Sequence, residues 1–203
     1  LGAATSSGAR FLNTMDTLWA FDPESPGTIE QSGPTGMIIL PYLDGARSPF
    51  DEAEATATIW GLRSSHTRDD IYKAIREALA YELSYIVEVM TSGDGAPKRI
   101  EALGGGALNA DFMQLSVDVT GIPHRVHPEI DAAYGTALMA MTVARPMDEI
   151  DRLKQVAHIR GAGAELTPNK ENARRYEVYR RRFEPLYRAC AAPRLDAAHS
   201  GHR

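Results

Sequence analysis

The sequence predicts a layered α/β domain, because short apolar runs alternate with longer segments of helical periodicity. Candidate strands, each a few residues long, are the segments 37–40, 57–62, 99–103 and 124–127. Helical spacing of apolar residues marks the segments 67–90, 110–120, 131–141 and 173–191, and a helical pattern also ends the segment 1–21. Residues 22–36 are rich in Pro and Gly and are predicted to form a loop.

The helix beginning near Thr67 has the strongest sequence signals. Thr67 is an N-cap candidate, and Asp70 three residues later is a variant of the capping-box partner. The turn at residues 92–95 ends this helix, and Gly121 ends the one that begins near Ala110.

Composition excludes several classes of protein. Of the 203 residues, 43% are hydrophobic and 24% are charged, as in an ordinary globular domain. The net charge of -5 provides no general attraction to nucleic acid or to an anionic membrane. No apolar run reaches the roughly 20 residues of a membrane helix. The single cysteine, Cys190, excludes an internal disulfide framework and fits a reducing cytoplasm. Because Leu1 is not an initiator Met, we expect the chain to begin inside a longer protein.

A glycine run, Gly104-Gly105-Gly106-Ala107, separates a predicted strand from a predicted helix. Glycines at such a junction let a ligand approach the backbone amides, and the following helix N-terminus favours phosphate. The run lacks both the Walker A pattern and the G-x-G-x-x-G spacing. Taken alone, such a run is more often an ordinary tight turn.

Several motifs in the same order resemble the FGGY carbohydrate kinases. The glycine run is followed by Gln114, Asp118, Gly121, Pro123, Asp131 and Gly135, which match the adenosine-site segment of that family. Upstream, Pro41, Gly45, Arg47 and Pro49 match a family loop, and residues 57–78 match its second signature except at Arg76. Leu166-Thr-Pro ahead of Tyr176, Tyr179, Phe183 and Tyr187 resembles the closing helix.

This resemblance implies an actin-like, ribonuclease-H-like ATPase domain with a mixed sheet flanked by helices. Residues 1–192 would be the C-terminal domain of a two-domain kinase, and residues 193–203 a disordered tail. A xylulokinase-like or ribulokinase-like enzyme is favoured over a glycerol kinase, which usually has Gly-Gly-Ala at the glycine run.

The resemblance also implies which residues hold ATP. Gly8, Gly104, Gly105, Gly106 and Ala107 would line the nucleotide site, with Asn109 beside the adenine. Mg²⁺ would be held mainly by the nucleotide phosphates. No catalytic residue is assigned, because the family's aspartate base and most of its sugar contacts belong to the N-terminal domain. We expect the 203-residue chain alone to bind ATP weakly and transfer no phosphate, and the resemblance leaves a homodimer open.

Five groups of residues allow two interpretations each. Asp118 and Asp131 are an acid–base pair or structural and capping residues, and Arg47 contacts a phosphate or clamps its loop. His66, His124 and His127 are metal ligands or isolated histidines, with no carboxylate or cysteine cluster beside them. The arginines near Tyr176 bind nucleic acid or form the solvated side of a core helix. Trp19 and Trp60 are core or pocket-wall residues.

Two further functions remain as alternatives to the kinase. One is a non-catalytic actin-like module that binds nucleotide or assembles with a partner, in a natural chain that starts near residue 1. The other is a nucleic-acid-binding domain, for which binding would fall with salt.

Overall fold

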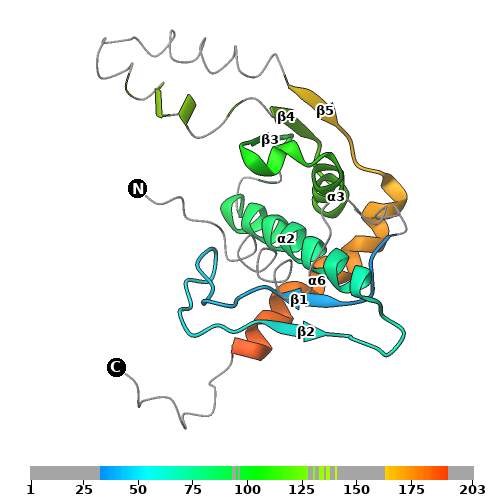
Figure 1. The fold of residues 1–203 in the computed structure, drawn as a ribbon. Helices are drawn as coiled ribbons and strands as arrows, with labels where there is room; N and C mark the ends of the chain where they lie inside the picture. The colour runs from blue at the N-terminus through cyan, green and yellow to red at the C-terminus, as the bar shows by residue number, and fades with distance from the viewer. Residues whose placement is uncertain are drawn as a thin grey trace. The chain divides into compact units, whose positions relative to one another are not determined.

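The computed structural model describes residues 33–92, 95, 97–127, 130, 133–134, 136–137, 140 and 163–191. The chain divides into two compact units. One unit contains Leu1–Met90 and Arg175–Arg203, and the other contains Thr91–Arg174. Strands and helices are interspersed along the described residues, as expected for the predicted α/β domain, although β1 and β2, and β4 and β5, follow each other without an intervening helix in the described part of the chain (Figure 1).

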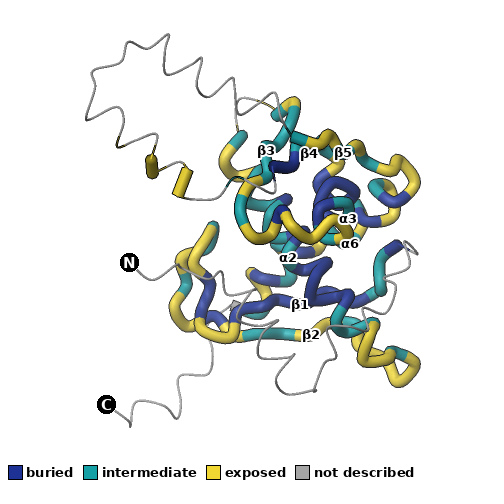
Figure 2. The backbone as a smooth tube through the Cα atoms, turned by 45° about the horizontal axis from the view of Figure 1, so that its top comes forward, coloured by how far each residue is buried: buried dark blue, intermediate teal, exposed yellow. Residues whose placement is uncertain are grey.

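The first unit contains a two-stranded antiparallel ribbon and a long helix. Strand β1 (Ile38–Leu40) pairs with β2 (Thr58–Trp60), with Ile39 opposite Ile59. Helix α2 (Arg68–Met90) packs against β1. Figure 2 shows the difference between the two strands: β1 is buried throughout, whereas β2 is only partly covered.

The predicted capping box at the start of α2 is confirmed. Thr67 Oγ1 accepts a hydrogen bond from the Asp70 amide at 3.2 Å, and Asp70 Oδ2 accepts one from the Thr67 amide at 2.8 Å. Each side chain therefore satisfies a backbone donor that the first helical turn leaves unpaired.

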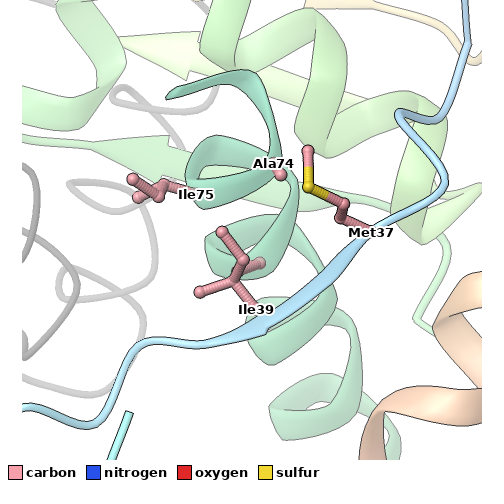
Figure 3. Packing of buried hydrophobic residues seen from close by; sticks show 5 residues of the cluster. Met37, Ile39, Ala74 and Ile75 are labelled. Carbon is pink, nitrogen blue, oxygen red and sulfur yellow. The ribbon is translucent and has the colours of Figure 1, made fainter. Parts of the chain in front are cut away.

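The core of this unit forms between β1 and the apolar stripe of α2. Met37 and Ile39 pack against Ala74, Ile75 and Ala78, all of which are fully buried (Figure 3). The alternation of Met37 and Ile39 matches the period of a strand, and the spacing of the α2 residues matches one helix face. Burial of each large side chain contributes about 1.5–3 kcal/mol.

Helix α6 (Lys170–Ala191) presents its aromatic residues to the core of the first unit. Tyr176, Phe183 and Tyr187 are buried, and the ring of Tyr187 stacks on Phe50 with centroids 3.4 Å apart. Five of the six arginines of this helix are exposed, and Arg180 is partly exposed, as expected for the solvated side of a core helix. The helix begins three residues earlier than predicted, because the Asn169 side chain accepts from the Glu171 and Asn172 amides.

The second unit contains a mixed sheet of order β3-β4-β5. Strand β3 (Ile100–Leu103) is parallel to β4 (His124–His127), and β4 is antiparallel to β5 (Ala164–Leu166). Helix α3 (Ala110–Thr120) has the predicted bounds and ends at Gly121, which has a left-handed backbone with φ 68°. Strand β5 was not predicted, because three residues show no alternation pattern.

One face of this sheet forms an apolar core with α3. Ala102 and Val126, which are opposite each other on β3 and β4, face Met113 and Phe112 of α3. The other side of the same strands carries Glu101, Arg125 and His127, since alternate residues point to opposite faces.

Some predicted features lie outside the described residues. These are the helical pattern of residues 1–21, Trp19, the predicted tail 193–203, and Asp131 and Gly135. Within 131–141, the described residues 133–134, 136–137 and 140 are helical. None of the helices in the described part of the chain combines the length and apolar character needed to span a bilayer.

Candidate functional site

The glycine run forms a turn between β3 and α3 that contains a short helix the sequence did not predict. Gly104 has φ 83° and ψ -168°, a backbone conformation that residues with a Cβ rarely adopt. Residues Gly105–Leu108 then form the 3₁₀ helix η1. Its turn is closed by hydrogen bonds from the Ala107 amide to the Gly104 oxygen at 2.9 Å and from the Asn109 amide to the Gly106 oxygen at 3.3 Å.

Gly105 and Gly106 leave the backbone of this turn open. Both are exposed, and a Cβ added to either would meet no atom within 4 Å. Neither amide donates a backbone hydrogen bond to any described residue, as expected for the first residues of a helix. The turn therefore has two exposed backbone donors at residues that carry no side chain.

The two residues that follow have roles in the fold. Ala107 is 6% exposed, and its methyl group belongs to the cluster with Met113 and Val126, so a ligand can meet only its backbone. Asn109 is the N-cap of α3, because its Oδ1 accepts from the Phe112 amide at 2.9 Å. Gly8 lies outside the described residues.

The buried Asp118 carboxylate accepts three hydrogen bonds within the second unit. Its Oδ1 accepts from Gln114 Nε2 at 2.9 Å and from the Asn169 amide at 2.8 Å, and its Oδ2 accepts from Asn172 Nδ2 at 2.9 Å. The residue is 4% exposed. These contacts join α3 to the start of α6, which supports the structural interpretation of Asp118 over the acid–base one.

The histidines of β4 point to opposite faces of the sheet, as predicted. His124 is buried, and its Nδ1 lies 2.8 Å from the Ile122 oxygen. Burial is the largest effect on its imidazole and holds the pKa below the usual value. His66 is elsewhere, in the first unit, where its Nδ1 accepts from the Arg63 amide at 2.9 Å. Across the described residues, no three His, Cys, Asp or Glu side chains gather as metal ligands do.

A polar pair between the partly buried Glu101 and the buried His127 connects β3 and β4 directly before the glycine turn, and the sequence did not reveal it. His127 Nε2 lies 2.9 Å from Glu101 Oε2, and Arg99 binds the other oxygen of the same carboxylate at 2.8 Å. Burial raises the pKa of the Glu101 carboxyl, but the hydrogen bonds from His127 and Arg99 together hold it below its usual value. Sequence spacing could not identify this pair, because only the strand register brings positions 101 and 127 together.

Trp60 and Arg47, two candidate residues of the first unit, are both exposed. Trp60 is 42% exposed and so is not a core residue; the Arg182 guanidinium lies 6.0 Å from its ring centroid. Arg47 is exposed in a loop that closes through a 2.7 Å hydrogen bond from the Asp51 amide to the Arg47 oxygen.

The first unit also holds a buried carboxyl group that the sequence analysis did not single out. Glu77 of α2 is fully buried, and it accepts from the Thr35 amide at 3.0 Å and from Thr35 Oγ1 at 2.8 Å. Burial raises the pKa of Glu77 to about 7, against the smaller opposing effects of Thr35 and Lys73.

Known proteins resemble this chain in sequence and in fold. The model of the FGGY family of carbohydrate kinases, C-terminal domain, matches residues 12–144. A xylulose kinase of Staphylococcus epidermidis is 26% identical over 164 residues, which cover 77% of this chain and 31% of that protein. The chain thus spans about a third of the length of this relative.

Solved structures support the same fold. The ligand-bound xylulose kinase of Lactobacillus acidophilus has a TM-score of 0.75 at 22% identity, over 90% of this chain and 38% of that one. Plasmodium falciparum glycerol kinase with ADP has a TM-score of 0.66 at 22% identity, over 93% of this chain and 38% of that one. These likenesses show the actin-like fold of the sugar kinases. Because the family model matches well over half of the residues, the chain belongs to the FGGY family of carbohydrate kinases, as its C-terminal domain.

Proposed function

We propose that this chain is the nucleotide-binding part of an ATP-dependent sugar kinase and that its glycine turn receives the nucleotide. The observation that carries the proposal is the open backbone at Gly105 and Gly106: both residues are exposed, lack a Cβ, and have amides that donate no backbone hydrogen bond to the described residues. Oriented backbone amides of this kind bind anionic or polar ligand groups closely. Membership of a kinase family and the likeness to a glycerol kinase with ADP support ATP as the ligand.

The neighbouring residues would shape this site in different ways. Gly104 provides the left-handed backbone that turns the chain, and Ala107 offers its backbone while its methyl group anchors the turn in the core. Asn109 holds the start of α3 and lies beside the adenine in the proposed site. Gly8 completes the set by its match to the family. Mg²⁺ would arrive with the nucleotide and be held mainly by its phosphates and by water.

The acceptor in this proposal is a sugar or polyol, with a pentulose such as xylulose favoured. The xylulose kinases among the similar proteins and the three glycines of the turn support this choice. We assign no catalytic residue to the chain. The base that activates the acceptor hydroxyl, and most sugar contacts, would belong to the N-terminal domain that the longer relatives contain.

Substitution of the open glycines tests the nucleotide site. Gly105→Val and Gly106→Val add side chains where the structure has free space, so both variants should fold as the parent does. They should nevertheless weaken ADP binding at least about tenfold in isothermal titration calorimetry, because the added methyl groups occupy the ligand's approach. Thr56→Val, at an exposed position of the other unit, is the matched control and should bind normally.

The outcome that opposes the proposal is unchanged ADP affinity in both folded glycine variants. The acceptor needs a separate experiment: a screen of sugars and polyols with ATP consumption as readout, using the protein as its gene encodes it. Turnover with a pentulose would support the favoured acceptor, and turnover only with glycerol would replace it.

A further inference from the structure

We propose that Glu101 and His127 are positioning residues that fix the conformation of the glycine turn. The inference rests on the proposed function, since its consequence for activity is a change in nucleotide affinity. It concerns contacts other than those proposed for the nucleotide, however, and all of them lie within the second unit.

The pair has a defined geometry. On the parallel strands β3 and β4, Glu101 lies opposite Arg125, so His127 is the next residue of β4 on the same face. The Nε2 atom of His127 lies 2.9 Å from Glu101 Oε2. Because a carboxylate can only accept, the imidazole carries its proton on Nε2 and donates it. Arg99 binds Oε1 through its Nε and an Nη atom, both at 2.8 Å, and so orients the carboxylate with Oε2 toward His127.

A short hydrogen-bonded path leads from His127 to the glycine turn. The His127 oxygen accepts from the Ile130 amide at 3.2 Å, and the Ile130 oxygen accepts from the Gly104 amide at 2.8 Å. Glu101 itself is only three residues before Gly104 on β3. The pair therefore holds both chain segments that determine where Gly104 begins its left-handed turn.

The His127 ring depends on Glu101 for its orientation. His127 is fully buried, and its Nδ1 atom has no hydrogen-bond partner among the described residues. The ring lies directly against Gly163, where an added Cβ would come within 2.8 Å of Nδ1 and 2.6 Å of Cε1. Removal of the Glu101 carboxylate would leave both ring nitrogens unpaired in a buried place, a costly arrangement that the end of β4 would relieve by moving.

Hydrogen exchange and nucleotide binding together test the proposal. In Glu101→Ala, the Gly104 amide should exchange at least about tenfold faster relative to the Ile100 amide, which bonds to the Pro123 oxygen at the start of the same strand. The same variant should bind ADP about tenfold more weakly. Glu101→Gln keeps an acceptor for Nε2 and should restore both values to within about twofold of the parent.

A control separates positioning from general stability. Val117→Ala removes a fully buried side chain of α3 in the same unit. It should lower the melting temperature while both amides exchange faster in equal proportion and ADP affinity stays within about twofold of the parent. Should Glu101→Ala fail to fold, Glu101→Asp replaces it, since the shorter side chain withdraws the carboxylate from Nε2 and predicts the same changes.

The proposal is overturned if Glu101→Ala, or Glu101→Asp where it replaces the alanine variant, leaves the Gly104-to-Ile100 exchange ratio unchanged. It is also overturned if Val117→Ala changes that ratio and ADP binding as much as Glu101→Ala does. Failure of the nucleotide site itself has a separate signature: the parent protein would not bind ADP, while the exchange ratio would still respond to Glu101.

Discussion

Replacement of Asp118 by alanine should destabilise the protein strongly. The carboxylate accepts three hydrogen bonds, from the Gln114 side chain, the Asn169 amide and the Asn172 side chain. An acid–base role would predict the opposite: lost activity in a protein of normal stability. The measurement therefore separates the two interpretations of this residue.

The expected loss follows from what each donor can do after the substitution. A hydrogen bond to a charged group contributes about 1.5–3 kcal/mol, but these contributions do not add when the donors can turn to water. Gln114 is partly exposed and Asn169 is exposed, whereas Asn172 is 9% exposed and would remain unpaired. We therefore expect Asp118→Ala to lower the free energy of unfolding by about 3 kcal/mol.

Urea unfolding followed by circular dichroism provides the measurement. Asp118→Asn keeps one acceptor oxygen and should lose about 1–2 kcal/mol, less than the alanine variant. Asp111→Asn, at an exposed position of the same helix, is the control and should change the free energy by no more than about 0.5 kcal/mol. If Asp118→Ala unfolds at the same urea concentration as Asp111→Asn, the structural role assigned to Asp118 is wrong.

Two other predictions concern a buried acid and a helix cap. Burial raises the folded-state pKa of Glu77 to about 7, above its ordinary value of 4.5. The stabilisation from its protonated form is thus complete below the ordinary value and is lost as the pH rises through about 7. Between pH 5 and 8 this loss of stability amounts to about 2.5 kcal/mol, and Glu77→Gln should abolish it in urea unfolding. Burial also raises the pKa of Glu82 to about 7, so the pH dependence that Glu82 contributes should remain in the Glu77→Gln variant. If the free energy of unfolding of Glu77→Gln falls with pH as steeply as that of the parent, the assignment to Glu77 is wrong. Asn109→Ala should cost about 1 kcal/mol in thermal unfolding because α3 loses its cap, whereas Asn109→Ser should cost much less. Equal melting temperatures for the two Asn109 variants would contradict the capping role.

The sequence predicted those parts of the fold whose signals are local. Helix α3 has the expected bounds because Asn109 can cap it and Gly121 can adopt the left-handed conformation that ends it. The capping box at Thr67 was equally readable, since both partners lie within one helical turn. The aromatic face of α6 followed from helical spacing alone.

Other features could not be predicted because they depend on which segments meet in space. The Glu101 to His127 contact requires the parallel register of β3 and β4, which no local pattern encodes. The 3₁₀ turn at Gly105–Leu108 was missed because glycines have no side-chain periodicity to reveal it. Trp60 was predicted to be a core or pocket-wall residue, but helix α2 packs against β1, and β2 is only partly covered, which leaves the Trp60 ring 42% exposed.

An NMR titration with ADP tests the central claim most directly. The amides of Gly105 and Gly106 would be followed in ¹⁵N-labelled protein as nucleotide is added. We predict that these two resonances shift with the binding curve and that their hydrogen exchange slows in the bound state, because the ligand provides the acceptors that the turn lacks. Saturable ADP binding that leaves both amides unshifted and unprotected would contradict the assignment of the nucleotide to this turn.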